Sequence, residues 1–305
     1  MIIQQRNIPL ELKLLRFIKA RMDFDSKAES NYQILEKGYR GEREFDNLMV
    51  DFSENLLVLN DLLLEYNGTL FQIDSLMISS NSIYLFEVKN FEGDYLIEND
   101  TWYSPSKSEI KNPLLQLQRT ESLIRRLLKE LRCHIPIETY LFFVNPEFQL
   151  YQTPQNAPIV FPSQHKRFIK KNTSKQVTLK DSHSKLAQQL LSLNIIESPY
   201  SRLPEFDFDT LDKGISCTSC QSLDTFLVKT KLICKHCGCK EDYSSAVLRS
   251  VDEFKLLFPN LKLTTNQIHE WCNTSKAKKT IRKILANNFK KRGRSVSSYY
   301  EDLDS

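Results

Sequence analysis

The sequence predicts an α/β protein: a β-sheet flanked by helices, then a short cysteine-rich segment and a small helical module. Short apolar or β-rich runs separated by Asn, Gly, Asp and Ser fill residues 56–97, a pattern typical of successive strands. Helical periodicity returns at 113–131, and another apolar run follows at 139–144. Strands with an intervening helix indicate a sheet on which helices pack.

Composition limits the class of protein. The chain has 305 residues, of which 41% are hydrophobic and 26% are charged, so we expect two or three globular units rather than a disordered chain. No apolar run is long enough to cross a bilayer. We therefore expect a cytoplasmic protein with no membrane partner.

The elements follow from local patterns. Apolar residues near helical period predict amphipathic helices at 8–22 and 35–49. Pro113 suits the first turn of the helix at 113–131. We expect strands at 56–64, 70–78, 83–89, 94–97 and 139–144, and a closing helix at 186–193.

Three ionisable residues interrupt the apolar runs between Phe71 and Asn90, namely Asp74, Glu87 and Lys89. If Ser79–Ser82 form the turn of an antiparallel hairpin, pairing about its centre places Asp74 opposite Glu87. Directly opposed side chains have Cβ atoms about 4.5–5.5 Å apart, and two carboxylates at that distance repel unless a cation or proton lies between them. The hairpin therefore predicts a site for a divalent metal ion.

Hard carboxylate oxygens suit Mg²⁺ or Mn²⁺, which activate water and neutralise charge during phosphodiester cleavage. Lys89 follows Glu87 by two residues and points to the same face, where its ammonium group can orient a water or stabilise phosphate charge. The alternative is an ordinary salt-bridged cluster on the exposed face of a sheet. A turn one residue longer or shorter would separate the two acids.

An Asp and a Glu-x-Lys on adjacent strands resemble the active site of the PD-(D/E)XK nucleases, and this version is similar to their nuclease-related domain (NERD) family. The resemblance covers roughly residues 36–145. It implies a restriction-endonuclease-like mixed sheet flanked by helices. The segments that carry it are Gly38-Tyr39-Arg40-Gly41-Glu42, Gln72-Ile73-Asp74, Glu87-Val88-Lys89-Asn90, Trp102 and Asn112-Pro113-Leu114-Leu115-Gln116.

The resemblance implies that Asp74 and Glu87 ligate Mg²⁺, that Glu42 adds a third carboxylate, that Lys89 assists the attacking water and that Gln116 completes the site. Ile73 replaces the proline that the superfamily name places before the first acid, and this changes no catalytic atom. The neighbours also have structural interpretations. Gly38 and Gly41 suit close packing, Trp102 a core position and Gln116 a solvated helix face.

Five of the seven cysteines lie between residues 217 and 239. Two Cys-x-x-Cys pairs, separated by thirteen residues, suit two knuckles that bring four thiolates onto one Zn²⁺ ion. We expect a structural zinc ribbon with Cys217, Cys220, Cys234 and Cys237 as ligands. His236 and Cys239 are interpreted as bystanders.

Three helices are predicted at 251–258, 264–272 and 275–289, in a helix-turn-helix-like arrangement. Residues 271–299 contain no acid, so we expect a polyanion partner, although a basic run can also be only a solvated face. The third helix could enter a groove of DNA, with the following residues at phosphates. The predicted DNA-binding residues are Lys276, Lys278, Lys279, Arg282, Lys283, Lys290, Lys291, Arg292 and Arg294.

The leading hypothesis is a Mg²⁺- or Mn²⁺-dependent DNA nuclease whose zinc ribbon and basic helices hold DNA, with RNA left open as a partner. The alternative is a catalytically silent nuclease fold that binds DNA in plasmid or DNA maintenance or regulation. A protein-interaction adaptor is a third possibility. We divide the chain into an N-terminal helical extension (1–35), the NERD nuclease-like domain (36–198), a linker (199–214), the zinc ribbon (215–242) and the basic helical module (246–305).

Overall fold

The computed structural model describes residues 1–53, 55–173, 178–195, 202–294 and 297–303. The chain divides into two compact units. The first unit comprises residues 1–8 and 33–200, and the second comprises residues 9–32 and 201–305. The predicted boundary between 198 and 199 and the start of the linker lie outside the described residues.

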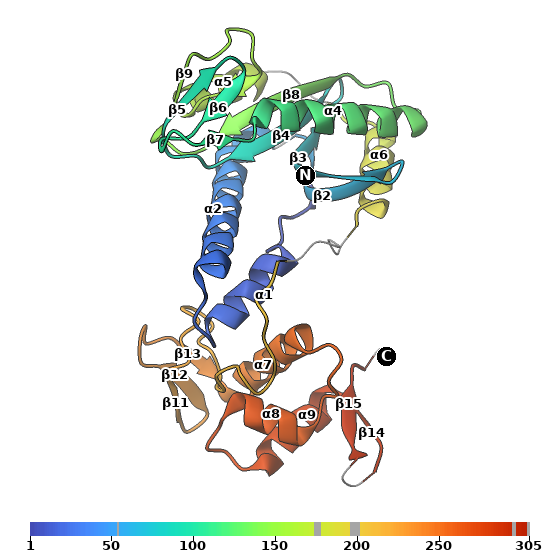
Figure 1. Cartoon of the computed structure of the whole chain (residues 1–305). Helices are drawn as coiled ribbons and strands as arrows, with labels where there is room; N and C mark the ends of the chain where they lie inside the picture. Colours follow the sequence, from blue (N-terminus) through green and yellow to red (C-terminus); the bar gives the residue numbers. More distant parts are fainter. Residues whose placement is uncertain (54, 174–177, 196–201, 295–296, 304–305) are drawn as a thin grey trace. The chain divides into compact units, whose positions relative to one another are not determined.

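A mixed sheet forms the centre of the first unit (Figure 1). Among the described residues six strands lie in the order β1-β2-β3-β4-β8-β10. β2, β3 and β4 are antiparallel neighbours, whereas β1 pairs with β2, β4 with β8, and β8 with β10 in parallel. The strand bounds are β1 Ile2–Gln4, β2 Leu57–Tyr66, β3 Thr69–Ile78, β4 Ile83–Lys89, β8 Ile137–Phe143 and β10 Ile159–Val160.

Helices cover both faces of this sheet because its central strands are apolar on both sides. Ile83 and Leu85 of β4 belong to one buried cluster, with residues of α4 and α6, while Tyr84 and Phe86 belong to another, with residues of α2 and α3. This alternation follows from the two-residue period of a strand. The helix bounds are α2 Ser26–Leu48, α3 Val50–Ser53, α4 Pro113–Glu130, η1 Pro162–Gln164, α5 His165–Thr173 and α6 Asp181–Ser192.

A smaller sheet in the first unit has the order β7-β6-β5-β9. It carries Trp102, which is 1% exposed, so the prediction of a core position for this residue is confirmed. The bounds are β5 Gly93–Glu98, β6 Thr101–Tyr103, β7 Glu109–Ile110 and β9 Phe148–Tyr151. The predicted α/β class, with a central mixed sheet between helices, is confirmed.

The second unit contains a three-stranded sheet, β11-β12-β13, and a set of helices that share one apolar core. α7 begins eight residues earlier than predicted because Asp242 caps it, accepting a hydrogen bond from the Ser244 backbone at 3.0 Å. The bounds are α1 Leu10–Lys19, β11 Thr225–Val228, β12 Lys231–Cys234, β13 Lys240–Asp242, α7 Tyr243–Leu257, α8 Thr265–Cys272 and α9 Lys278–Asn288.

The basic segment after α9 is a strand and not a helical tail. β14 (Lys290–Arg292) pairs antiparallel with β15 (Tyr299–Glu301), and Tyr300 also bridges to Leu263, just before α8. The order along the chain is therefore α7, a short extended segment at Leu263, α8, α9 and the β14–β15 hairpin. The pairing partner, Tyr300, is 4% exposed, and its burial anchors the hairpin to the helices.

Some helix limits differ from the predicted ones. α2 starts at Ser26 rather than near residue 35, and α6 starts at Asp181 rather than near residue 186. Both helices extend at their N-terminal ends, where polar residues hide the apolar periodicity that the prediction used. None of the described helices is both long enough and apolar enough to cross a membrane.

Candidate active site and zinc site

The hairpin of β3 and β4 has the predicted register. Ser79 and Ser82 close its turn through a backbone hydrogen bond of 2.9 Å. Pairing runs from Ile78 opposite Ile83 to Ser75 opposite Phe86. The next position in this register places Asp74 opposite Glu87, and there the ladder gives way to a side-chain contact: Oδ2 of Asp74 accepts a hydrogen bond from the backbone of Val88 at 2.7 Å.

Lys89 and Gln116 join this end of the hairpin. The Lys89 ammonium donates to Oε1 of Glu87 at 2.6 Å and to Oε1 of Gln116, on α4, at 3.2 Å. The Glu87 side chain is only 3% exposed, and that of Lys89 is 20% exposed. The structure therefore brings together four of the predicted residues, of which Asp74 and Glu87 are buried, Lys89 is half-buried and Gln116 is exposed.

Glu42 reaches the same site from α2, held by an arginine that the sequence patterns did not reveal. Arg6 donates to Glu42 at 2.8 Å, makes two hydrogen bonds to the Asp46 carboxylate at 2.9 and 3.1 Å, and donates to the backbone carbonyl of Asp74 at 2.9 Å. Its side chain is 2% exposed. Arg6 thus links the helix that carries Glu42 to the strand that carries Asp74.

Two glutamates of this cluster, Glu87 and Glu42, resist ionisation. Burial, together with the nearby Asp74 charge, raises the pKa of Glu87 to about 7 and that of Glu42 to about 8, against the opposing effects of Lys89 and Arg6. Burial disfavours the charge of Lys89, but the carboxylates of Glu87 and Asp74 raise its pKa. Raised carboxyl pKa values mean that another cation in this cluster would displace protons as it binds.

Asp61 is, after Arg6, a second residue of this site that the sequence patterns did not reveal. It lies on β2 in the left-handed region, with φ of 55°, and accepts a hydrogen bond from Gln72 at 2.8 Å. Burial raises its pKa, while Arg6 opposes this effect. Neither Asp61 nor Arg6 belongs to a short motif, and Arg6 precedes Asp74 by 68 residues. Only the pairing of β1 with β2 brings the N-terminal segment to this site.

The glycines near Glu42 have different surroundings. A Cβ on Gly41 would lie 2.4 Å from Cβ of Asn90, so Gly41 permits a close approach of α2 to the end of β4. Asn90 completes that approach by donating to the backbone carbonyl of Lys37 at 2.8 Å. A Cβ on Gly38 would meet nothing within 4 Å. The packing interpretation therefore fits Gly41 and not Gly38.

The four predicted zinc ligands of the ribbon converge. Their sulfur atoms all lie within 4.8 Å of one another, with Sγ–Sγ distances of 3.6 Å for Cys217–Cys237 and 3.5 Å for Cys220–Cys234. Four sulfurs at about 2.3 Å from a tetrahedral Zn²⁺ lie about 3.8 Å apart. The quartet fits this geometry and donor chemistry.

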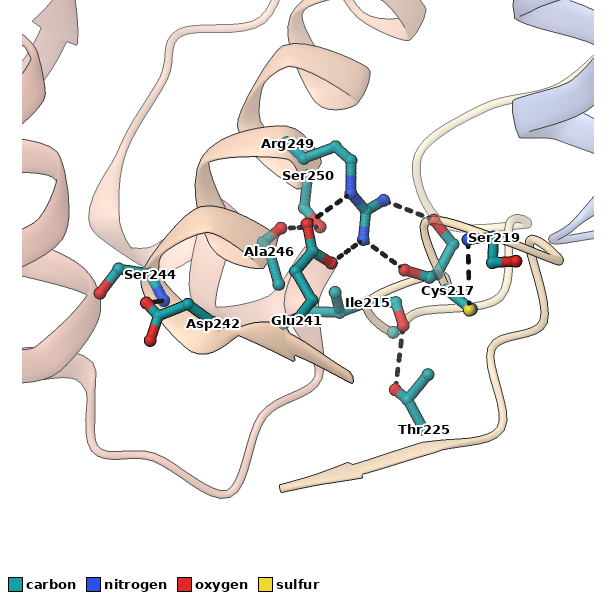
Figure 2. Close-up of polar contacts among 12 residues, drawn as sticks. Ile215, Cys217, Ser219, Thr225, Glu241, Asp242, Ser244, Ala246, Arg249 and Ser250 are labelled. Atoms are coloured by element: carbon teal, nitrogen blue, oxygen red, sulfur yellow. Dashed lines mark hydrogen bonds and ion pairs between the residues drawn. The ribbon is translucent and has the colours of Figure 1, made fainter. Parts of the chain in front are cut away.

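Local turns shape the two knuckles. Cys217 Sγ accepts a hydrogen bond from the Ser219 backbone at 3.4 Å (Figure 2). Gly238, with φ of 73°, donates to the carbonyl of Cys234 at 3.0 Å. Within the described part of the chain, this quartet is the one group of three or more His, Cys, Asp or Glu side chains with ligand atoms so close together. His236 and Cys239 are not members of it.

Most of the predicted DNA-binding side chains are exposed. Arg292 differs from the others because it pairs with Glu301 at 2.7 Å, and Lys276 is half-buried. α9 buries Ile281, Ile284 and Leu285, which leaves its basic residues on the other side. The exposed cations are Lys278, Lys279, Arg282 and Lys283 on α9, Lys290 and Lys291 on β14, and Arg294 after it.

A comparison with known protein families finds a match for the segment that contains the β3–β4 hairpin. Residues 37–144 match the model of the nuclease-related domain. Searches of curated proteins and of solved structures gave no match. The matched segment contains Glu42, Asp74, Glu87, Lys89 and Gln116. Residues 37–144 are therefore similar to the nuclease-related domain.

Proposed function

We propose that the first unit is a metal-dependent nuclease that hydrolyses phosphodiester bonds of DNA. The observation that carries this proposal is the convergence of Asp74, Glu87 and Lys89 at one end of the β3–β4 hairpin. Two acids from adjacent strands, one of them 3% exposed, lie beside an ammonium group that remains partly open to solvent. The match of residues 37–144 to the nuclease-related domain supports the same reaction class.

The donor set fits Mg²⁺ or Mn²⁺, with Asp74 and Glu87 as the ligands. Such an ion, when bound, supplies a Lewis acid for the phosphate and lowers the pKa of a water. Lys89, already 2.6 Å from Glu87, orients the attacking water and stabilises the charge that develops on phosphate. Gln116 holds Lys89 in place from α4, and Glu42 supplies a third carboxyl group, which loses its proton as the cation binds.

The second unit is proposed to bind DNA through α9 and the residues that follow it. Its element order, three helices and then a hairpin, suits a helix-turn-helix whose third helix enters the major groove. The exposed lysines and arginines of α9 and β14 would contact phosphates. The cysteine quartet holds structural Zn²⁺. A reducing, cytoplasmic environment suits its free thiols.

The test is a cleavage assay with linear, circular and single-stranded DNA, with Mg²⁺, with Mn²⁺, and with neither. The matched protein is the Asp74→Ala, Glu87→Ala double variant, checked for an unchanged fold by circular dichroism. We expect metal-dependent cleavage that falls by about 10³-fold or more in the double variant. Cleavage that persists in the double variant would remove the assignment of this site.

A second function has its own observation. Two carboxylates of the cluster already form an ion pair with a side chain of the protein: Glu42 pairs with Arg6, and Glu87 pairs with Lys89. This pairing favours a catalytically silent nuclease fold in a protein that binds DNA for plasmid or DNA maintenance or regulation. A salt-dependent DNA complex that is never cleaved under any metal would select this alternative.

A further inference from the structure

The three strands of the zinc ribbon separate its side chains into two faces. Register places Leu227, Leu232 and Glu241 in one row across β11, β12 and β13. The rows on either side of it point to the opposite face. These outer rows consist of Phe226, Ile233 and Lys240, and of Val228, Lys231 and Asp242.

The first face is occupied by the protein itself. Leu232 is 7% exposed and belongs to the apolar core of the second unit, against which Leu227 also packs. Glu241 receives two hydrogen bonds from Arg249 of α7, at 3.2 and 2.7 Å (Figure 2). The same guanidinium donates to the backbone carbonyl of Ser216 at 2.6 Å. The ribbon is therefore fixed on α7, and its orientation is defined.

The opposite face is open and partly apolar. Phe226 is 42% exposed and Val228 is 43% exposed, and neither belongs to, or packs against, the apolar core of the second unit. An aromatic ring and a branched aliphatic side chain thus lie on a sheet surface that faces away from the protein core. We call this surface, consisting of Phe226, Val228, Ile233, Lys231 and Lys240, the outer ribbon face.

Positive charge surrounds the outer ribbon face. Lys240 is exposed next to Ile233, and Lys229 is exposed in the turn between β11 and β12. The one acid in its two rows is Asp242, which lies 3.7 Å from the Lys231 ammonium, with both side chains well exposed. Such a surface pair is weak, so Lys231 can exchange Asp242 for a stronger anion.

We propose that the outer ribbon face binds single-stranded nucleic acid, with a base stacked on Phe226 and phosphates at Lys231 and Lys240. A flat aromatic ring beside lysines is the combination by which proteins bind unpaired bases without reading their sequence. In a duplex the bases are stacked inside the double helix, where the Phe226 ring on a flat sheet does not reach them. The convex surface of α9 instead suits a groove of a duplex. The exposed apolar surface of this face consists of only two side chains. A stable dimer buries roughly 800 Å² on each partner, which is much more.

This inference refines the DNA-binding part of the proposed function and is independent of catalysis. The two are tested separately, because oligonucleotide binding requires an intact ribbon and no cleavage. The protein is the full chain loaded with Zn²⁺, without Mg²⁺ or chelator. The probes are a fluorescent twelve-nucleotide oligothymidylate and a twenty-base-pair duplex, and the measurement is fluorescence anisotropy.

Phe226→Ala should weaken oligothymidylate binding about 5- to 150-fold, the effect of losing one stacked base, and leave duplex binding unchanged. Phe226→Trp should retain binding, and its fluorescence should be quenched by the oligonucleotide. Tyr151→Ala is the matched control because Tyr151 is also an exposed aromatic residue, 52% exposed, but lies in the first unit. It should change neither affinity.

Lys240→Glu tests the same face with a side chain that lies at the surface, and it should weaken the oligothymidylate complex while the zinc content stays at one ion per chain. Three results would overturn the proposal. They are an absence of oligothymidylate binding by the wild-type chain, equal binding by wild type and Phe226→Ala, and equal weakening of single-stranded and duplex binding.

Discussion

The chain has two candidate metal sites, and they differ in how they balance charge without a metal ion. In the first unit, Arg6 and Lys89 place positive groups against Glu42 and Glu87, so protein groups compensate the buried acids. In the ribbon, the four sulfur atoms contact one another and the local backbone. The acid cluster already contains positively charged side chains, whereas the cysteine quartet has the geometry to hold an external cation.

This difference has a consequence for folding. The first unit has a large core on both faces of its sheet, so it can fold with its acid cluster metal-free and bind Mg²⁺ afterwards. The ribbon contributes few residues to the core of the second unit, so a Zn²⁺ ion bound by the cysteine quartet would supply much of its folding free energy. One site therefore suits an exchangeable catalytic ion, and the other suits a permanent structural ion.

The largest expected effect is the loss of zinc. A strong chelator should unfold residues 215–242, because structural Zn²⁺ contributes about 10–16 kcal/mol of apparent binding free energy to such small domains. Hydrogen exchange measured by mass spectrometry should show loss of protection in this segment and retention of protection in β3 and β4. Cys237→Ser should reproduce the effect, and Cys133→Ser should not. Unchanged protection of the ribbon after complete zinc removal would contradict a structural role for the ion.

The next effect concerns the internal cation of the acid cluster. Arg6→Ala leaves Glu42 and Asp46 without their buried partner and should lower the free energy of unfolding of the first unit by about 3 kcal/mol. Mn²⁺ should then raise Tm more in this variant than in the wild type, since the ion replaces the missing charge. Thermal denaturation with and without Mn²⁺ measures both.

Arg125→Ala is the control for that experiment. Arg125 pairs with Glu121 on the surface of α4, with its side chain 54% exposed, and its removal should cost at most about 0.5 kcal/mol. Equal destabilisation by the two substitutions, or an equal response to Mn²⁺, would show that Arg6 does not act as the internal cation of the site.

A smaller effect is expected from pH. The folded chain keeps protons on Glu87 and Glu42 up to pH values of about 7 and 8, whereas ordinary glutamates release them near 4.5. The unfolded chain therefore binds fewer protons over this interval, so the metal-free first unit should lose stability as pH rises from about 5 to about 8. Urea denaturation across this range measures the slope.

Glu87→Gln should flatten that pH dependence, because the amide mimics the protonated acid and does not titrate. Glu92→Gln is the control, since Glu92 lies nearby but its side chain is 60% exposed. A wild-type stability that rises over the same pH interval would contradict the raised pKa values of the acid cluster.

The smallest effect for a single substitution is expected on α9. Arg282→Glu should weaken duplex binding and reduce the slope of log affinity against log salt by about one for each phosphate that Arg282 neutralises. Lys185→Glu, on an exposed position of α6, should leave the affinity and the slope unchanged. Equal weakening in both variants would indicate a response to net charge and not to a surface on α9.

The parts that could be predicted from sequence are those whose determinants are close together in the chain. The four-residue turn at Ser79–Ser82 sets the register of Asp74 and Glu87, and the two-residue period of β4 places Lys89 with Glu87. Likewise, two Cys-x-x-Cys knuckles determine the cysteine quartet. Each of these depends on local geometry that a short motif records.

The parts that could not be predicted depend on pairing over long distances. Arg6 reaches the acids only because β1 pairs with β2, whose residues follow about fifty positions later, and no motif marks a lone arginine. The strand at β14 was not predicted either, because it forms by pairing with the segment around Tyr300, which is buried and bridged to Leu263. Tertiary contacts, and not local propensity, decide both.

The most direct test of a metal site in the acid cluster is the number of Mn²⁺ ions that the zinc-loaded chain binds, measured by electron paramagnetic resonance at a mildly alkaline pH. We expect at least one Mn²⁺ per chain in the wild type and its loss in the Asp74→Ala, Glu87→Ala double variant, with Zn²⁺ retained in both. An absence of Mn²⁺ binding, or equal binding by both proteins, would contradict a metal site at the end of the β3–β4 hairpin.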